Sequence, residues 1–244
     1  MRNLKSIYIL SVKGSPRQAN FKTFPFKYSF FYAISLDQLD VFDDDASFNK
    51  YKRIVRNTEK SCTLSHISIA KDFLGKNHDW LIILEDDAVI VGDFEKLLSS
   101  LDNHKFNRPT ALIIGHSKTD PRFSIVQRLK QPLYNPFYIG DFRFGKKEVN
   151  YIGTVSYILN YPAAQILAKT DRPYWVADDW IEIEKKGINV FHIEENIIYE
   201  NLDGVSSTGN KVYIRHDIYK KPISNIMSII YHQVKFFLKE KCHF

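Results

Sequence analysis

The most informative pattern in the chain is a pair of apolar runs separated by three consecutive acids. Trp80–Leu84 is a short run of aromatic and branched residues, and Ala88–Val91 is a second apolar run. Such runs are typical of strands that are buried on both faces of a covered sheet. Between them stand Glu85, Asp86 and Asp87, which cannot be buried unpaired without a large desolvation cost. The pattern predicts an interior strand that carries the acids at its C-terminal end, where an α/β sheet opens into its ligand crevice.

Apolar positions elsewhere in the chain predict further strands and helices. Strands are expected at Ser6–Val12, Phe30–Ile34, Ala111–Gly115, Asn150–Leu159 and Ile188–Ile193. Helices are expected at Thr58–Leu74, Asp93–Leu101, Tyr161–Lys169 and Asp179–Lys186. Residues 37–49 are acidic and polar and are expected to form a surface loop. Residues 116–145 are aromatic and poorly periodic, and we interpret them as a lid or an acceptor-side loop.

From Pro222 onward the chain follows a different pattern, a single apolar stripe at helical spacing. The stripe comprises Ile223, Ile226, Met227, Ile230, Val234, Phe237 and Leu238, and the lysines around it are Lys220, Lys221, Lys235, Lys239 and Lys241. A basic amphipathic helix can lie on an anionic membrane surface, or it can pack on its own domain or on a second subunit. The sequence leaves these alternatives open. We divide the chain into a main domain at 1–212 and a basic amphipathic helical tail at 213–244.

Composition narrows the class of protein. The chain has 244 residues with 34 Lys and Arg against 28 Asp and Glu, a net charge of +6 that suits anionic partners. Its charges are mixed rather than arranged in a stripe, and no nucleic-acid-binding motif is present, so we expect no nucleic-acid partner. The two cysteines, Cys62 and Cys242, exclude a disulfide scaffold and a multi-cysteine zinc module. No apolar run is long enough for a signal peptide or a membrane span, so we expect a cytoplasmic protein, soluble or peripheral to the membrane.

Several positions are candidates for ligand contacts. Carboxylates at the end of a buried strand can hold Mg²⁺ or Mn²⁺, which prefer oxygen ligands, although a solvated acidic turn fits the spacing equally well. Arg17 follows a Gly-Ser loop after the first strand, where backbone N–H groups and a guanidinium can bind a diphosphate. Gly153 interrupts an expected strand, which indicates the close approach of a ligand or another backbone segment. His66 lies on an expected helix, where a lone histidine is usually a surface or hydrogen-bonded core residue.

A second acidic pair, Asp178 and Asp179, stands between Trp175 and Trp180. Carboxylates between aromatic rings suit sugar recognition, because the rings can stack on sugar faces while an acid takes a hydroxyl or acts as a base. Asp178 is also a good N-cap for the helix expected at Asp179–Lys186. Both interpretations can hold together.

Taken together, these motifs resemble glycosyltransferase family 25, the bacterial lipooligosaccharide galactosyltransferase type. The resemblance spans roughly residues 6–209. It rests on Arg17 after the first strand, Phe31-Tyr32-Ala33-Ile34, the helix segment Glu59…Cys62-x-x-Ser65-His66, Leu84-Glu85-Asp86-Asp87, Gly153-Thr154-x-x-Tyr157 with Ala163, and Ala177-Asp178-Asp179. The chain departs from the family pattern at Ser11, where Asn is common, and at Ser61, where Gly is common.

The resemblance implies a fold and a set of site residues. The fold is an α/β, GT-A-like single domain with a mixed, mostly parallel Rossmann-like sheet flanked by helices. Glu85 and Asp87 are implied as metal ligands, and Asp178 or, as second choice, Asp179 as the catalytic base. The residues implied for nucleotide-sugar binding are Ser11, Val12, Arg17, Ala33, His66, Asp86, Gly153 and Thr154. Further candidate ligands for metal or phosphate are His192 and His216.

The same resemblance implies an activity. It is the inverting transfer of galactose from UDP-galactose, with Mn²⁺ or Mg²⁺, to a terminal glucose or N-acetylglucosamine of lipooligosaccharide, as in a β-1,4-galactosyltransferase. The alternatives are the same scaffold using UDP-glucose or a UDP-N-acetylhexosamine, and a metal-dependent phosphohydrolase using the same acids. The implied partners are the lipooligosaccharide acceptor and the anionic inner face of the cytoplasmic membrane, and a homodimer is left open.

Overall fold

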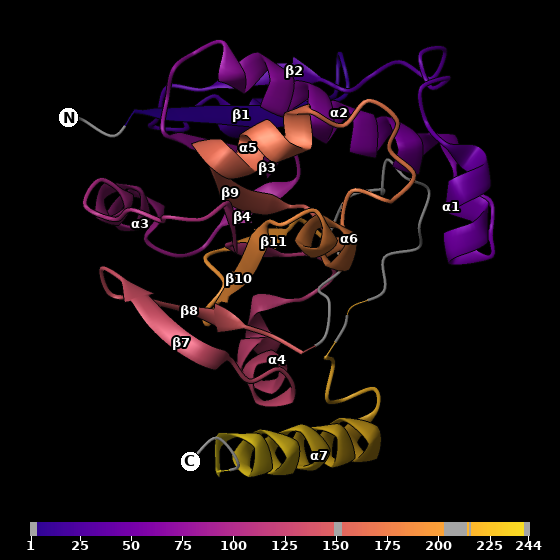
Figure 1. Ribbon diagram of the computed structural model, residues 1–244. Coiled ribbons are helices and arrows are strands. Elements are labelled where there is room, and N and C mark those ends of the chain that lie inside the picture. The colour runs from indigo at the N-terminus through magenta and orange to yellow at the C-terminus, as the bar shows by residue number, and fades with distance from the viewer. Residues whose placement is uncertain (1–3, 149–152, 203–213, 215, 242–244) are drawn as a thin grey trace.

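An eight-stranded mixed sheet forms the centre of the molecule (Figure 1). The computed structural model describes residues 4–148, 153–202, 214 and 216–241. Across the sheet the strands are β2 (Ser29–Tyr32), β1 (Lys5–Ser11), β3 (Trp80–Glu85), β9 (Ser156–Asn160), β5 (Thr110–Ile113), β10 (Asn189–Ile193), β8 (Phe142–Lys146) and β7 (Tyr134–Ile139). β9 and β8 run opposite to the other six. The expected α/β fold, with a mixed sheet flanked by helices, is confirmed.

Strand β3 lies inside the sheet, parallel to β1 and antiparallel to β9. Its side chains alternate between two hydrophobic cores, as the pleat of a strand requires. Leu81 and Ile83 pack under the helices α2 (Asn57–Leu74), α5 (Tyr161–Ala168) and α6 (Trp180–Lys185). Ile82 and Leu84 pack in the core on the other face, under α3 (Phe94–Leu101). Because all four are fully buried, the strand is fixed from both sides and its end is a rigid place for a site.

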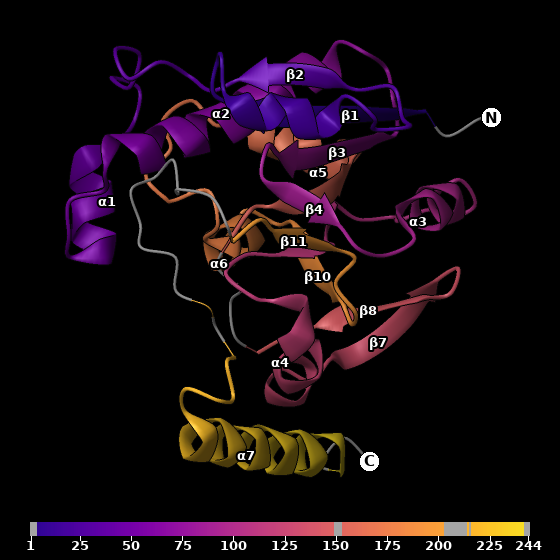
Figure 2. The ribbon, with the colours of Figure 1, turned by 180° about the vertical axis from the view of Figure 1, so that it is seen from behind.

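A small second sheet continues the chain beyond the acids. It has the order β4-β11-β6, with β4 at Ala88–Ile90, β11 at Ile198–Glu200 and β6 at Gly115–His116. Figure 2 shows β4 and β11 side by side below β3. In their antiparallel register Glu200 stands opposite Ala88, directly after the acidic triplet. This pairing joins a late segment of the chain to the end of the central strand.

The segment 116–145 contains helices and strands, so the prediction that it is a loop was wrong, and its role as a lid or on the acceptor side stays a prediction. It contains the 3-10 helix η2 (Pro121–Phe123), the helix α4 (Ser124–Lys130) and the hairpin of β7 and β8 at the sheet edge. Three of its aromatic residues belong to the second core, where Phe144 is fully buried and Phe137 and Phe142 pack against that core. The alternation of apolar and polar residues that marks a strand was not visible in the sequence, because the register of the hairpin shifts between Tyr134 and Phe137.

Helix α1 (Asp44–Tyr51) occupies much of the segment that was expected to be a loop. Asp43 caps it, since its side chain accepts a hydrogen bond of 3.0 Å from the Ala46 N–H. The short 3-10 helix η1 (Pro16–Phe21) follows β1. These two elements border the end of the sheet at which the acids stand.

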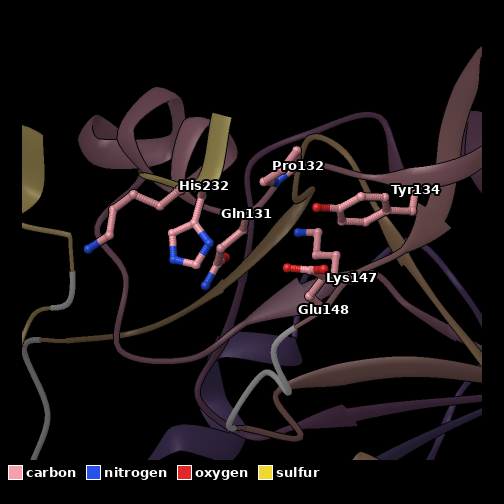
Figure 3. A pocket seen from close by; sticks show the side chains of 7 residues that line it. Gln131, Pro132, Tyr134, Lys147, Glu148 and His232 are labelled. Atoms are coloured by element: carbon pink, nitrogen blue, oxygen red, sulfur yellow. The ribbon is translucent and has the colours of Figure 1, made fainter. Parts of the chain in front are cut away.

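Helix α7 (Pro222–Lys241) lies against α4, away from β1 and β2 (Figure 1). Polar and aromatic side chains make contacts here: Lys130 Nζ donates to Asn225 Oδ1 at 3.0 Å, and Gln233 Nε2 donates to the Leu129 carbonyl at 2.6 Å. The Phe236 ring packs against that of Tyr134, with centroids 5.1 Å apart. Figure 3 shows His232 of α7 next to Gln131, in a cavity of about 10 Å³. A space of that size holds no more than one water molecule, so α7 is packed closely against Gln131 at this point.

The apolar stripe of α7 faces outward. Its exposed fractions run from 48% for Ile226 to 78% for Ile223. The helix is therefore not using its stripe to pack on its own domain. No helix within the described residues is long and apolar enough to cross a membrane. The division at residue 212 falls outside the described residues and stays a prediction.

Candidate active site

The acidic triplet stands where β3 ends and turns toward β4. Glu85 is the last residue of β3, and Asp86 and Asp87 form the turn. Ser11, at the end of the neighbouring strand β1, donates its hydroxyl to Asp86 Oδ2 at 2.7 Å. Arg17 Nη1 lies 3.0 Å from Asp87 Oδ2 and 3.4 Å from Asp86 Oδ1. The ends of two adjacent parallel strands and a guanidinium thus meet around the acids, as expected at the opening of an α/β sheet.

The loop after β1 holds Arg17 in this position. Ser15 accepts a hydrogen bond of 3.3 Å from the Arg17 N–H and thereby caps η1, with Pro16 at its first turn. Gln18 Nε2 donates to the Ser11 hydroxyl at 3.1 Å and to the Val12 carbonyl at 2.9 Å. The candidate diphosphate loop is therefore folded back onto the acids, with the Val12 side chain 53% exposed.

Helix α2 fixes the chain on the other side of Ser11. The Ala33 N–H donates to the Ser11 carbonyl at 2.9 Å. Ser61 donates its hydroxyl to the Ile34 carbonyl at 2.5 Å, and Ser65 accepts from the Ile34 N–H at 2.9 Å. The serine at position 61 thus fastens the segment after β2 to the helix.

Glu85 is the most heavily engaged acid of the triplet. The Thr154 hydroxyl donates to its Oε1, and His66 Nε2 lies 3.7 Å from the same oxygen. Burial raises the pKa of Glu85, but the neighbouring His66 and Thr154 outweigh that effect and hold the pKa below its usual value. The Glu85 carboxylate is accordingly ionised at neutral pH.

Glu200 is a fourth acid at this place, and the sequence reasoning missed it. It ends β11, and its Oε2 accepts a hydrogen bond of 2.9 Å from the Lys118 N–H. Burial, and secondarily the charge of Glu85, raises its pKa. The available signal was the run Ile197–Tyr199 followed by an acid, which repeats on a smaller scale the pattern of an apolar strand ending in a carboxylate.

Asp87 has the most strongly perturbed carboxyl group at this place. Burial raises its pKa to about 8, helped by the charges of Glu85 and Glu200 and opposed by Arg17. Its Oδ1 is buried without a hydrogen-bond partner within residues 4–148, 153–202 and 216–241. Such an oxygen among other carboxylates has the chemistry of a cation ligand. The residues therefore fit a hard divalent ion such as Mn²⁺ or Mg²⁺.

Asp178 lies beside the triplet and at the rim of a cleft of about 790 Å³. Its Oδ2 accepts a hydrogen bond of 2.9 Å from the Gly153 N–H. Burial raises the pKa of Asp178, and the charge of Glu85 adds to the rise. Gly153 has φ +117°, and a Cβ there would lie 2.0 Å from Ser117 Oγ. The glycine is thus required by close backbone packing.

Asp179 has a different environment from its neighbour. Its Oδ1 accepts the Glu182 N–H at 3.2 Å and caps α6, so the prediction that Asp178 is the cap was wrong. Its Oδ2 accepts the Tyr51 hydroxyl at 2.6 Å and lies 3.2 Å from Lys50 Nζ. Both carboxylate oxygens are used in holding α1 and α6 together.

The tryptophans on either side of this pair belong to the core. Trp175 and Trp180 are each 1% exposed, and the indole Nε1 of Trp180 donates to the Gly153 carbonyl at 3.4 Å. The interpretation that these rings stack on sugar faces was therefore wrong. Dense packing under the sheet, and not sugar binding, explains why large aromatic residues stand there.

The two further histidine candidates lie on other elements. His192 is buried on β10, where burial and the nearby Lys147 lower its pKa well below its usual value. The His216 ring lies against that of His116, with centroids 6.0 Å apart. The role of these two rings as ligands stays a prediction.

Comparison with known proteins identifies the family. The sequence profile of glycosyltransferase family 25 (LPS biosynthesis protein) matches residues 4–181. That span is well over half of the chain, so the chain belongs to glycosyltransferase family 25, which confirms the resemblance of its motifs. Membership supports glycosyl transfer in lipopolysaccharide biosynthesis as the class of activity.

The comparisons with curated proteins and with solved structures give no further information about activity. No curated protein matches the sequence. Among solved structures the chain is similar to the crystal structure of A197 from STIV, with 15% sequence identity and a TM-score of 0.41 over 78% of this chain and 81% of that chain. A likeness at this level carries no conclusion about activity.

The raised pKa of Asp87 predicts a specific dependence of stability on pH. Since the carboxyl group titrates near roughly 3.9 in an unfolded chain but at about 8 when folded, the folded state binds the proton more tightly. Its free energy of unfolding should fall as pH rises between those values. Asp87→Asn removes this titration. In EDTA, the free energy of unfolding of the variant minus that of the wild type should therefore increase by at least about 1 kcal/mol from pH 5 to pH 8.

Urea unfolding at the two pH values measures this difference. The exposed residue Asp171 supplies the control, because Asp171→Asn should follow the wild type at both pH values. A stability difference between Asp87→Asn and wild type that does not change with pH would contradict the prediction.

Proposed function

We propose that this protein transfers a sugar from a UDP-sugar to a terminal sugar of lipooligosaccharide. Galactose is our first choice for the transferred sugar, and glucose or an N-acetylhexosamine is the alternative. The transfer inverts the anomeric carbon and uses a GT-A-like arrangement at the end of β3. The observation that carries the proposal is the buried Oδ1 of Asp87, which has no hydrogen-bond partner among the described residues and lies among Glu85, Asp86 and Glu200. An excess of carboxylates around such an oxygen is suited to a cation that in turn binds a diphosphate.

Glu85 and Asp87 would hold Mn²⁺ or Mg²⁺, with Glu200 as a further candidate oxygen ligand. The ion supplies Lewis-acid neutralisation of the diphosphate as it leaves. Asp86 and Ser11 are joined by a hydrogen bond, and we assign them to the nucleoside. Arg17 can shift from the acids to a phosphate, because a guanidinium binds either oxyanion through the same fork of N–H groups.

Asp178 is the preferred base on the acceptor side. An inverting transfer needs one group to take the proton of the acceptor hydroxyl. The raised pKa of Asp178 brings it closer to the working pH than an exposed carboxylate, and its place at the cleft gives it access to an acceptor. Asp179 suits this role less well because both of its oxygens already accept hydrogen bonds.

Arginines in the cleft support an anionic acceptor. Arg53 and Arg56 line it together with Asp178. Arg53 makes two hydrogen bonds of 2.8 Å to Glu59, which holds its guanidinium at the cleft. Glu59 pairs with Arg56 as well, so a phosphorylated sugar would bind an arginine in place of Glu59 rather than a rim of net positive charge.

The outward stripe of α7 supports a place at the anionic cytoplasmic face of the membrane. Its apolar side chains are surrounded by lysines, and the side chains of Lys235 and Lys239 are 40% and 50% exposed. An apolar face flanked by cations is the pattern of a helix that lies in a lipid interface. A second copy of the chain is the alternative occupant.

Calorimetry of UDP binding tests the metal-dependent donor site. UDP should bind at least about tenfold more tightly with Mn²⁺ than in EDTA, a difference of roughly 1.4 kcal/mol, and Asp87→Asn should abolish that difference. Asp171→Asn should preserve it. The proposal fails if manganese does not change UDP affinity in the wild type. Release of phosphate from a UDP-sugar panel without transfer would instead identify a phosphohydrolase.

Substituting each of the two adjacent acids, Asp178 and Asp179, tests which of them is the catalytic base. Asp178→Asn should lower kcat by about 10²- to 10⁴-fold while UDP affinity stays within a factor of about two, because the base acts on the acceptor and not on the donor. Asp179→Asn should keep transfer within about tenfold, since an amide still caps α6. Full activity in both variants would show that neither is the base.

Vesicle cosedimentation tests α7. Val234 on the stripe and Val41 elsewhere are equally exposed, at 53% and 51%, so Val234→Glu should weaken binding to anionic vesicles while Val41→Glu should not. A chain ending before Pro222 should also pellet less and still act on a soluble acceptor. Unchanged pelleting of both altered proteins would exclude the membrane role, and loss of a dimer in light scattering would indicate a second subunit.

A further inference from the structure

Helix α2 places two ligating side chains against the last residue of β3. Cys62 and His66 are four residues apart and so lie one above the other on one face of the helix. The ligand atoms of Cys62, His66 and a Glu85 carboxylate all lie within 4.8 Å of one another. One helix and one strand, each fixed by the core, therefore present a sulfur, a nitrogen and an oxygen to a common point.

The imidazole of His66 is oriented for ligation. The residue is 3% exposed, and its Nδ1 lies 2.8 Å from the Tyr157 hydroxyl. When Nδ1 donates that hydrogen bond, Nε2 carries the lone pair, which is the arrangement that supports metal-binding histidines. Nε2 has no hydrogen-bond partner in the part of the chain that the structure describes. A buried imidazole nitrogen thus faces Glu85 Oε1 at 3.7 Å, beyond hydrogen-bond distance, with the Cys62 sulfur within 4.8 Å of both.

The spacing of these atoms suits a small tetrahedral ion. His66 Nε2 and Glu85 Oε1 are 3.7 Å apart, close to the roughly 3.4 Å between two ligands that each lie about 2.1 Å from zinc. The Thr154 hydroxyl donates to the same carboxylate and orients it. Cys62 is partly exposed, which leaves a path for an ion from solvent.

The surroundings favour a positive charge at this point. Burial raises the pKa of the Cys62 thiol, and the charges of Glu85, Asp178 and Asp87 raise it further. A bound cation would relieve the repulsion among these carboxylates, and the thiol proton would leave to solvent as the sulfur–metal bond forms.

We propose that Cys62, His66 and Glu85 form a second cation site, for a thiophilic divalent ion such as Zn²⁺. It is distinct from the donor's metal site in its ligands, because Mn²⁺ and Mg²⁺ select oxygen whereas thiolate and imidazole select zinc. Three protein ligands leave a fourth position open to water. The two sites share Glu85, so each ion competes for the same carboxylate.

Competition for Glu85 makes the second site an inhibitory one, a consequence that rests on the proposed donor site. By linkage, an ion that weakens the hold of Glu85 on Mn²⁺ must itself be bound less tightly when Mn²⁺ and UDP are present. Zinc at the Cys62 site should therefore lower the affinity for UDP in the presence of Mn²⁺.

Cobalt spectroscopy of the full chain tests the site without any activity measurement. Addition of Co²⁺ to the EDTA-stripped, desalted protein should produce a near-ultraviolet thiolate-to-cobalt charge-transfer band, and Zn²⁺ should displace it. Cys62→Ser should abolish the band and Cys242→Ser, the matched control, should retain it. His66→Gln should lower cobalt affinity at least about tenfold, a difference of roughly 1.4 kcal/mol.

Absence of the band in the wild type, or its survival in Cys62→Ser, would overturn the proposal. Circular dichroism shows whether each variant is folded, and His66→Gln keeps the test decisive if Cys62→Ser does not fold. UDP calorimetry in Mn²⁺ with added zinc then tests the coupling. A cobalt band without any binding of UDP would retain the second site and reject the donor site, whereas UDP binding without the band would do the reverse.

Discussion

Repulsion among carboxylates at the end of β3 is the constraint on which the rest of the site depends. Glu85, Asp86 and Asp87 follow a fully buried strand, and Glu200 joins them from β11. Arg17 offsets part of this charge, yet the pKa of Asp87 remains near 8. A fold optimised for stability alone would not gather these groups, because buried like charges destabilise the folded state. The two hydrophobic cores that clamp β3 supply the stability that allows it.

The same arrangement gives neighbouring groups different chemistry. Glu85 stays ionised because His66 and Thr154 lower its pKa. Asp87 takes up a proton more readily, and its Oδ1 has no hydrogen-bond partner in the part of the chain that the structure describes. A divalent cation reverses this preference, since it favours the charged form of every carboxylate that it contacts. A proton and a divalent ion therefore compete for the Asp87 carboxylate, because each offsets the same negative charge.

Local sequence patterns predicted those strands and helices whose own residues show the pattern of burial. The run before Glu85 reads as a buried strand because each of its side chains is buried, and Leu64, Ile67 and Ala70 mark α2 by spacing. Glu200 could not be placed in the same way, because its position depends on the pairing of β11 with β4, a contact between distant segments. Periodicity in the segment 116–145 was likewise hidden by the register shift of its hairpin.

Asp178 and Asp179 show why residue type alone could not assign a base. Both are aspartates between two tryptophans, and either could cap the helix that follows. The helix begins at Trp180, so the cap falls on Asp179, whose other oxygen accepts the Tyr51 hydroxyl. Asp178 is left facing the acids, with the Gly153 N–H holding one oxygen. A shift of one residue in the start of α6 would exchange these environments. The point at which a short helix begins therefore determines which of the two carboxylates is free for chemistry.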